Sequence, residues 1–313
     1  MAGISLSWHD RPPDSFRQGA VSIGNFDGVH LGHRALIAQL QQLTQLRGGP
    51  VVMVTFHPHP LALLAPDSLP IPLMTLRQRT ETLRQAGADA VWVLPTERDL
   101  LALDAPAFFH AILRDRLHAH SVVEGFNFRF GNRRAGDMNT LRQLCEQSEM
   151  DCREVAPILD DGEAISSSRI RQALLRGEIE PANRWLGQPY RLSGKVVSGA
   201  QRGRNLGFPT ANLAEVETLI PAVGVYAVRA WVDNRPYAAA ANIGPNPTFG
   251  ESERKLEVHL LDFQGNLYDR TLEIEFIAYL RATRPFAGIE ALLEQLRLDI
   301  AQARHLVPLE SRS

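Results

Sequence analysis

The spacing of apolar residues along this 313-residue chain changes from a helical to a strand period near residue 186. From residue 20 to 186, short runs rich in β-branched residues alternate with longer segments of helical spacing. After Gly187, short segments alternate between apolar and polar residues, which is typical of half-buried strands. The chain is about twice as long as a typical domain. We therefore predict two domains, residues 1–186 and 187–313.

The first domain is expected to be an α/β domain with a parallel sheet covered by helices on both faces. Parallel strands need crossover connections, which are usually helices, and the result is a Rossmann-like arrangement. Ligands of such sheets lie beyond the carboxyl ends of the strands. The expected strands are 21–23, 51–56, 90–94, 121–124 and 152–155.

Helix-start signals lie between these strands. Thr75 with Gln78 is a capping-box pair that starts one helix. Asp104 with Pro106 starts a second helix, and Asn139 is expected to cap a third.

The second domain is expected to be all-β, a small antiparallel barrel with a helix at its C-terminal end. Its expected strands are 190–197, 225–232, 237–241, 256–261 and 272–277. Apolar residues then recur at helical spacing and predict a helix that packs on the barrel. These residues are Ile289, Leu292, Leu293, Leu296 and Ile300.

Composition excludes several classes of protein. The net charge of −2 argues against a large nucleic-acid footprint, although a small anionic ligand needs only local positive charge. The chain has neither a run of 18 apolar residues nor an apolar signal segment at its start. The two cysteines, Cys145 and Cys152, are too few for a disulfide framework or a metal cluster. We expect a cytoplasmic protein with no membrane or nucleic-acid partner.

The segment Gly24–His33, GNFDGVHLGH, lies between the first expected strand and a helix marked by Leu36 and Leu40. Its glycines let the backbone pass close to a ligand, and the first amides of a helix can bind phosphate. Two histidines add donors at the same helix entry. Neither GxGxxG nor GxxxxGKS/T is present, so this is neither a dinucleotide fingerprint nor a P-loop. The alternative is a glycine-rich turn with two solvated histidines.

The segment Thr55–Pro60, TFHPHP, follows the second expected strand. Its prolines are expected to fix an extended loop and to bar a helix from starting, so that His57 and His59 project on a stiff turn. For His57, a solvent-exposed position is at least as well supported as a ligand contact.

The segment Gly125–Asp137, GFNFRFGNRRAGD, follows the fourth expected strand. Aromatic residues alternate with Asn127 and Arg129, which predicts rings on one side and polar groups on the other. The glycines permit close approach to a base or a phosphate. The alternative is an edge loop with a solvated pair, Arg133 and Arg134.

The segment Ile165–Arg171, ISSSRIR, opens a helix. A serine cap is ordinary structure. Three hydroxyls, free amides of the first turn and Arg169 together suit a triphosphate better, because the guanidinium fork matches phosphate oxygens.

In the second domain, the Gly- and Arg-rich part of Gly199–Asn212 suits a flap over phosphates. Thr210 and Asn212 are oxygen donors two residues apart, which project together from an extended segment and suit Mg²⁺. An ordinary surface loop is the alternative. Further on, Glu257 and His259 share one face of an expected strand, and the alternative for Glu257 is a solvated strand glutamate.

These motifs together resemble those of the bacterial bifunctional riboflavin kinase/FMN adenylyltransferases, the prokaryotic FAD synthetases. HLGH resembles the HxGH signature of the nucleotidyltransferase superfamily, and GNFDGVHLGH, GFNFRFG and ISSSRIR resemble motifs of the family. GRNLGFPTANL resembles the riboflavin kinase signature, and GVYA, NIG and EVHLLDF follow in the family's order. Four positions depart from the family's pattern, namely His57, Asn127, Ser168 and Asp269, where an acidic residue, Asp, Thr and Gly are usual.

The resemblance implies two ATP-dependent reactions with Mg²⁺, phosphorylation of riboflavin to FMN and adenylylation of FMN to FAD with release of pyrophosphate. Riboflavin, FMN and ATP are the implied partners, and weak self-association stays open. The implied catalytic residues are His30 and His33 in the first domain and Glu257, the general base, in the second. The implied ATP ligands of the adenylyltransferase are Gly24, Asn25, Phe26, Asp27, His30, His33, Asn127, Arg129, Ser167, Ser168 and Arg169. Those of the kinase are Gly199, Arg202, Gly203, Arg204, Gly207, Pro209 and Thr210. The flavin ligands are His59, Pro60, Asn242 and Glu257, and the metal ligands are Thr210 and Asn212.

Two other functions compete with this one. One is a member of the nucleotidyltransferase superfamily that acts on another phosphate acceptor and carries the barrel as a regulatory domain. The segment Pro209–Asn212, PTAN, and Glu257 disfavour this function. A nucleic-acid-binding module built on the small barrel is disfavoured by the slightly acidic net charge.

Overall fold

A computed structural model describes residues 3–199, 206–245 and 255–309. They group into two compact units, Met1–Ser166 (the first unit) and Ser167–Ser313 (the second unit). The helices α7 (Ser167–Arg176) and α8 (Ile179–Leu186) group with the second unit, upstream of the change of period at residue 186. The assignment of one activity to each side of residue 186 stays a prediction.

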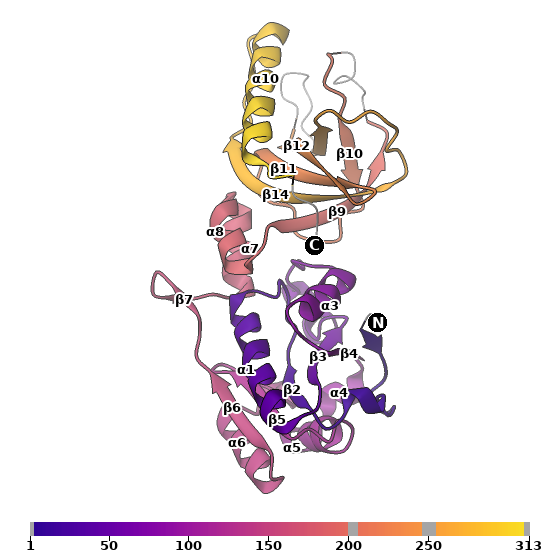
Figure 1. Cartoon of the computed structure of the whole chain (residues 1–313), viewed down its shortest axis with the longest axis vertical. Helices are drawn as coiled ribbons and strands as arrows, with labels where there is room; N and C mark the ends of the chain where they lie inside the picture. Colours follow the sequence, from indigo (N-terminus) through magenta and orange to yellow (C-terminus); the bar gives the residue numbers. More distant parts are fainter. Residues whose placement is uncertain (1–2, 200–205, 246–254, 310–313) are drawn as a thin grey trace. The chain divides into compact units, whose positions relative to one another are not determined.

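A six-stranded sheet with all pairings parallel forms the centre of the first unit (Figure 1). The strand order is β1-β4-β3-β2-β5-β6. Along the chain, β3 and β4 are added on one side of β2, and β5 and β6 on its other side. The sheet therefore has a topological switch point between β2 and β5, and ligands of such sheets bind at this point. The predicted parallel sheet is confirmed, with β1 as an additional short strand. The strands are β1 (Ile4–Ser5), β2 (Ala20–Ile23), β3 (Val51–His57), β4 (Ala90–Pro95), β5 (Ser121–Gly125) and β6 (Asp151–Val155).

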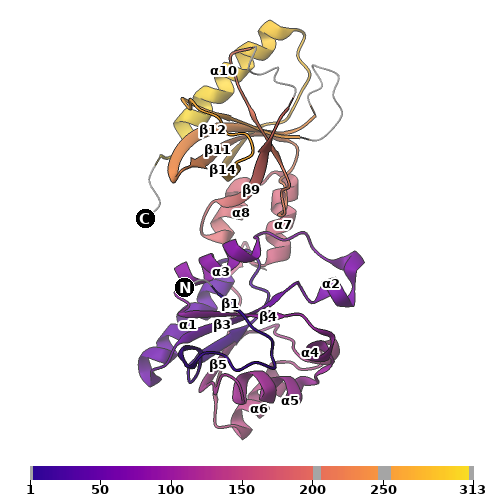
Figure 2. The ribbon, with the colours of Figure 1, turned by 90° about the vertical axis from the view of Figure 1, so that its right-hand side faces the viewer.

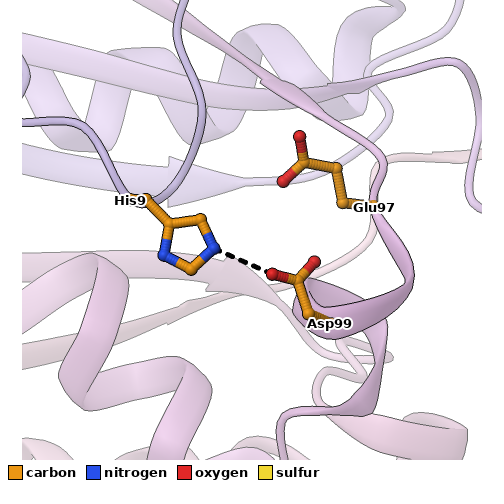
Figure 3. A group of neighbouring side chains, drawn as sticks. All are labelled: His9, Glu97 and Asp99. Atoms are coloured by element: carbon orange, nitrogen blue, oxygen red, sulfur yellow. Dashed lines mark hydrogen bonds and ion pairs between the residues drawn. The ribbon is translucent and has the colours of Figure 1, made fainter.

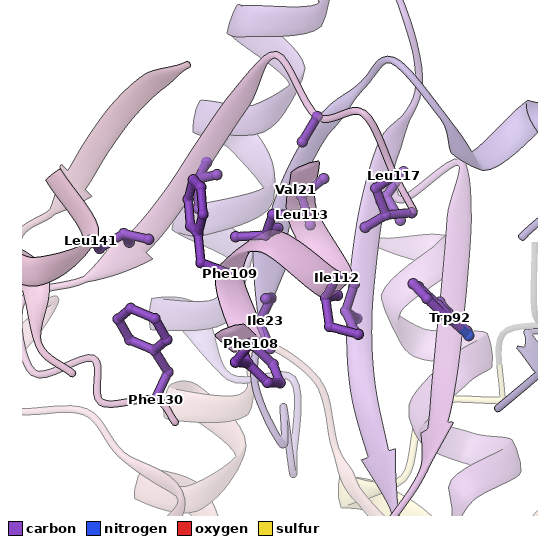
Figure 4. Close-up of a cluster of buried hydrophobic side chains, with 14 of the residues drawn as sticks. Val21, Ile23, Trp92, Phe108, Phe109, Ile112, Leu113, Leu117, Phe130 and Leu141 are labelled. Carbon is purple, nitrogen blue, oxygen red and sulfur yellow. The ribbon is translucent and has the colours of Figure 1, made fainter. Parts of the chain in front are cut away.

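Helices cover both faces of this sheet (Figure 2). On one face, Met53 packs with Ile37 of α1. On the other, Trp92 belongs to a buried cluster with Phe109 and Ile112 (Figure 4). The helices are α1 (Leu31–Arg47), α2 (Leu61–Leu64), α3 (Leu76–Gln85), α4 (Arg98–Ala102), α5 (Ala105–Phe108) and α6 (Met138–Gln147). Shorter elements are η1 (Asp14–Phe16), η2 (Pro66–Ser68), η3 (Phe109–Arg114), η4 (Asn132–Arg134) and the strand pair β7 (Leu159–Asp160) and β8 (Glu163–Ala164).

The helix starts follow the sequence signals with one exception. The capping box at the start of α3 is present, and Asp104 caps α5 by accepting the amide hydrogen of Ala107. The prediction that Asn139 caps α6 is wrong. Asp137 is the cap, because its Oδ1 accepts the amide hydrogen of Thr140 at 3.0 Å, and Asn139 lies inside the helix.

A closed antiparallel barrel of six strands forms the second unit together with α7, α8 and α10 (Ile289–Leu306). The order is β10-β13-β12-β11-β14-β9, which confirms the predicted barrel and adds β10 to the five expected strands. The strands are β9 (Tyr190–Val197), β10 (Ala211–Ala214), β11 (Gly224–Val232), β12 (Arg235–Gly244), β13 (Lys255–Leu260) and β14 (Thr271–Arg281).

The C-terminal helix α10 packs on the barrel through its second half (Figure 1). Ala303 and Val307 join Ala227 of β11 in a buried cluster. The predicted stripe is wrong at its start, because Ile289 is 52% exposed. Asp299, which interrupts the apolar pattern, is instead buried in an ion pair with Arg281 of β14.

Candidate functional site

Two imidazoles stack at the entry of α1. The ring centroids of His30 and His33 lie 3.7 Å apart, and the edge of the Phe26 ring faces His33 at 5.3 Å. Gly32 leaves room for the stack, because a Cβ atom there would lie 3.1 Å from Cε1 of His30. Within the part of the chain that the structure describes, Nδ1 of each histidine is buried without a hydrogen-bond partner. A ligand could supply the missing partners.

Both imidazoles are neutral at pH 7. Burial lowers the pKa of His30 to about 4. Burial also holds the pKa of His33 well below its ordinary value, and the charge that His30 gains at low pH and the charge of Arg79 add to this effect. A neutral imidazole has one N–H donor and one acceptor nitrogen. The pair therefore offers hydrogen bonds to an anion, and a bound anion would raise both pKa values.

The loop between β2 and α1, residues 24–30, contains three positive φ angles. They are 47° at Phe26, 87° at Gly28 and 41° at Val29. Positive φ is strongly disfavoured for a β-branched residue such as Val29, whose side chain is fully buried. Such strain costs on the order of 1–3 kcal/mol per residue and occurs mainly at functional sites, where the surrounding packing imposes it.

A second polar pair joins the loops that follow β2 and β3. The side-chain amide of Asn25 lies 2.9 Å from Nε2 of His59, and Nδ1 of His59 accepts the amide hydrogen of Leu61. His57 is exposed, in agreement with the solvent-facing alternative. The expectation that the prolines bar a helix is wrong, because α2 begins directly after Pro60, whose fixed φ suits a helix start.

Asp27 links the β2–α1 loop to the segment before α3. Its two carboxylate oxygens accept the amide hydrogen of Leu73, each at 3.0 Å, and Oδ1 accepts that of Met74 at 3.1 Å. The side chain is buried. Asp27 thus has a structural role in the loop, and the ATP contact that the resemblance implies stays a prediction.

The loop after β5 separates rings from polar groups, with one exception. Phe128 and Phe130 stack at a centroid distance of 5.3 Å against the core, as predicted. Asn127 and Arg129 are exposed, but Phe126 is exposed as well. Nη1 of Arg129 lies 3.5 Å from a carboxylate oxygen of Asp137, the cap of α6.

The ISSSRIR segment forms the start of α7. Ser167 and Ser168 are its first two residues, and the guanidinium of Arg169 lies 4.2 Å from the ring centroid of Trp185 on α8. These residues belong to the second unit, whereas the stacked histidines belong to the first. The predicted grip on a triphosphate stays a prediction.

Three polar residues lie side by side on the barrel. Glu257 of β13 pairs with Asn212 of β10 on one side and with Asn242 of β12 on the other. Directly paired residues project from the same face of a sheet. Because Leu256 and Val258 are buried, the three polar side chains share the opposite, partly exposed face.

The PTAN segment is held against this face. Nδ1 of His259 donates a hydrogen bond to the carbonyl oxygen of Pro209 at 2.7 Å, and Thr210 is exposed. A Cβ atom at Gly199 would lie 2.2 Å from the Asn212 side chain, so only glycine permits this approach. Gly207 is exposed in the adjacent turn. The predicted ligands Arg202, Gly203 and Arg204 lie outside the described residues.

Comparisons with known proteins agree with both halves of this picture. A family model for FAD synthetase matches residues 13–169, and one for riboflavin kinase matches residues 186–307. The bifunctional riboflavin kinase/FMN adenylyltransferase of Pseudomonas fluorescens is 37% identical over 299 residues, which cover 95% of this chain and 96% of that protein. The chain belongs to this family. It is an enzyme with riboflavin kinase and FMN adenylyltransferase activities.

Further relatives of the riboflavin kinase/FMN adenylyltransferase family cover nearly the same length. The proteins of that name from Escherichia coli K12 and Bacillus subtilis are 37% and 35% identical and align with 92% and 91% of this chain, and with 93% and 92% of their own lengths. The crystal structure of a macrolide-efflux protein from Streptococcus pneumoniae has a TM-score of 0.89 at 30% identity, covering 98% of this chain and 100% of that one. Among the described helices, none is both long and apolar enough to cross a membrane.

Sequence reasoning missed one residue at the switch point of the sheet in the first unit. Glu124 of β5 is 2% exposed, and its Oε1 accepts the amide hydrogen of Ile23 at 2.6 Å, next to the end of β2. Burial raises the pKa of this carboxyl well above its ordinary value. The sequence signal for this residue is that Glu124 is the single acidic residue in the strand segment Ser121–Gly125.

A separate group of polar side chains lies near the N-terminus of the enzyme (Figure 3). Side-chain atoms of His9, Glu97 and Asp99 lie within 4.8 Å of one another. Nε2 of His9 contacts Asp99 at 2.8 Å, both side chains are more than half exposed, and Ser7 donates to Glu97. The group ties the N-terminal segment to the start of α4 by exposed polar contacts.

Proposed function

We propose that adenylyl transfer takes place at the entry of α1, with His30 and His33 donating hydrogen bonds to the α-phosphate and the leaving pyrophosphate of ATP. The observation that carries this proposal is the stacked pair, in which Nδ1 of each ring is buried and has no hydrogen-bond partner among the described residues. The FMN phosphate is already an anion, so no activated side-chain nucleophile is needed. Catalysis then consists of aligning two phosphates that repel each other and stabilising charge in the transition state.

The other proposed ATP ligands of the adenylyltransferase are those that the family motifs indicate. Asn25 and Phe26 belong to the strained loop that leads to the histidines. Arg169 adds a guanidinium for the triphosphate. His59 and Pro60 are proposed to contact the flavin. The remaining proposed ligands are Gly24, Asp27, Asn127, Arg129, Ser167 and Ser168.

For the kinase reaction, we propose Glu257 as the general base that takes the proton from the ribityl 5′-hydroxyl as its oxygen attacks the γ-phosphate. The row of Asn212, Glu257 and Asn242 supports this, because it places a carboxylate between two amides on a partly exposed face. Thr210 and Asn212 provide oxygen donors, which fit Mg²⁺. Bound with ATP, Mg²⁺ would neutralise phosphate charge. The kinase's ATP ligands are Gly199, Arg202, Gly203, Arg204, Gly207, Pro209 and Thr210.

Two variants of the whole chain test both assignments and serve as controls for each other. His33→Ala should lower the kcat of FAD formation from FMN by roughly 10²- to 10³-fold, as loss of one oxyanion donor does, and leave FMN formation intact. Glu257→Gln should abolish FMN formation from riboflavin and leave FAD formation from supplied FMN intact. Chromatographic separation of riboflavin, FMN and FAD over time measures both.

The outcomes separate the roles. A raised KM at normal kcat in His33→Ala would assign His33 to ground-state binding. Loss of both activities in either variant would indicate misfolding, and normal FMN formation by Glu257→Gln would exclude Glu257 as the base.

A cytoplasmic location is also proposed. Cys145 and Cys152 are free thiols, as is usual in reducing compartments. Weak self-association stays a prediction.

A further inference from the structure

Arg79 lies outside the sequence motifs, yet its guanidinium reaches the loop after β2 and the end of β3, where the second loop of the proposed adenylyl-transfer site begins. The residue lies on α3 and is 7% exposed. Nη1 donates to the carbonyl oxygen of Asn25 at 2.8 Å, and Nη2 donates to that of Phe56 at 3.0 Å. Asn25 follows β2 and Phe56 lies near the end of β3, which is the direct neighbour of β2. One side chain therefore joins the carboxyl ends of two adjacent strands.

Hydrogen bonds run in both directions between the β2–α1 loop and α3 with the residues just before it. Asp27 of the loop accepts the two amides just before α3, and the capping box fixes the start of that helix. Arg79 then reaches back from the helix to the backbone of the loop. Burial lowers the pKa of Arg79, and the charge of Asp27 opposes that effect. A buried guanidinium with such a partner is costly to disturb, because its loss leaves polar groups without partners.

The chemistry of the guanidinium matters for this contact. Its nitrogens are held in one plane, so two carbonyl oxygens bound to them are fixed in both distance and direction. A lysine ammonium keeps the charge but cannot reproduce the planar fork. The carbonyl of Asn25 belongs to the residue whose side chain contacts His59, and the strained residues and His30 follow directly.

We propose that Arg79 is a positioning residue for adenylyl transfer, which fixes the two loops that align the phosphates of ATP and FMN by holding the main chain at Asn25 and Phe56. The inference rests on the proposed placement of this reaction at the stacked histidines. Displacing reacting groups by about 1 Å can cost about 10²-fold in rate. Loosening either loop should therefore lower kcat more than it raises KM.

The test compares Arg79→Met and Arg79→Lys in the full chain. Arg77→Met is the matched control, because Arg77 is exposed on the same helix. We expect Arg79→Met to lower the kcat of FAD formation from FMN by about tenfold to hundredfold, with smaller changes in the KM values for ATP and FMN. Arg79→Lys should recover part of this loss, and Arg77→Met should behave as the wild type. The riboflavin kinase rate and the circular dichroism of each preparation report whether the chain is folded.

A wild-type kcat in folded Arg79→Met or Arg79→Lys overturns the inference, and so does a loss that lies entirely in KM. If Arg79→Met does not fold, Arg79→Lys decides, with reduced kcat at nearly unchanged KM as the supporting result. His33→Ala is measured in parallel. A wild-type kcat in His33→Ala overturns both the placement of the site and this inference. A reduced kcat in His33→Ala together with a wild-type kcat in Arg79→Lys overturns the inference about Arg79 alone.

Discussion

At the scale of single residues, the stacked histidines couple the stability of the first unit to pH. His30 has an ordinary pKa of 6.5 and a pKa of about 4 in the folded protein because it is buried. Between these values the unfolded chain binds a proton that the folded chain does not bind, so stability rises with pH. The stabilising effect is fully present above about pH 6.5 and is lost as the pH falls toward 4.

We therefore expect the first unit to lose stability between pH 7 and pH 4. The difference between 6.5 and about 4 corresponds to on the order of 3 kcal/mol across the window. Urea unfolding at several pH values, followed by pulsed hydrogen exchange in peptides of β2 and β3, measures it. His30→Gln should flatten this dependence, and His57→Gln, at the exposed end of β3, should not. An equally steep dependence in His30→Gln would contradict the assignment.

Asp27 provides a second test at this scale. Asp27→Asn keeps the size of the side chain but removes one of the two acceptor oxygens that hold the amides of Leu73 and Met74. Oδ1 of the asparagine can still accept both amides, but its NH₂ group would face the buried amide of Leu73 where a charged acceptor oxygen was, which costs about 1–3 kcal/mol. Thermal unfolding should show this loss, and FAD formation should fall while FMN formation stays normal. Unchanged unfolding would indicate that these hydrogen bonds are dispensable.

At the scale of secondary-structure elements, a buried ion pair joins α10 to the barrel. Asp299 is 1% exposed, and Arg281 of β14 donates to it from Nε at 2.9 Å and from Nη2 at 2.7 Å. Gln295 donates to the same carboxylate at 2.9 Å. The guanidinium and the carboxylate neutralise each other where α10 crosses β14. Removal of one side chain therefore leaves the charge of the other buried and uncompensated.

Asp299→Ala should destabilise the second unit by about 3–5 kcal/mol, because Arg281 would lose its counter-charge. The matched control is Asp262→Ala, since Asp262 also bonds α10, through Arg304, but both side chains are exposed. An exposed pair contributes little to stability, because water and salt screen its charges. Urea unfolding followed by the rate of FMN formation compares the two variants. Equal losses would show that burial does not govern the strength of these contacts.

At the scale of the whole molecule, the chain carries two ATP-dependent reactions that share a need for charge neutralisation on phosphates. We expect removal of divalent cations with a chelator to stop both FMN and FAD formation without unfolding either unit, because the backbone pairing of β10 on both sides holds Asn212, a proposed ligand, without a metal ion. Added Mg²⁺ should restore both reactions. Circular dichroism and the product time course measure this outcome. Unchanged rates in the chelator would remove Mg²⁺ from the mechanism.

Local pattern in the sequence was sufficient to predict the parallel sheet, the barrel and two histidines at a helix entry, whereas the stacking of their rings came only from the structure. Burial of alternate or helically spaced residues depends on neighbours in the chain, so the period of apolar residues reveals it. Asp269 stands where the family usually has Gly, and the structure shows a positive φ of 61° there. The cap of α6 was misplaced by two residues, because Asp137 and Asn139 are both good caps and the apolar pattern does not choose between them.

Only the tertiary structure decided which distant residues meet. Arg79 lies 54 positions from Asn25 and 23 from Phe56, and it contacts both because β2 and β3 are neighbours in the sheet. The row around Glu257 likewise depends on barrel order and register. The sequence alone determined the family motifs, the two fold classes and the chemistry of the candidate residues. Sheet order, register and burial decided which side chains hold the site in place, because these contacts act through space rather than along the chain.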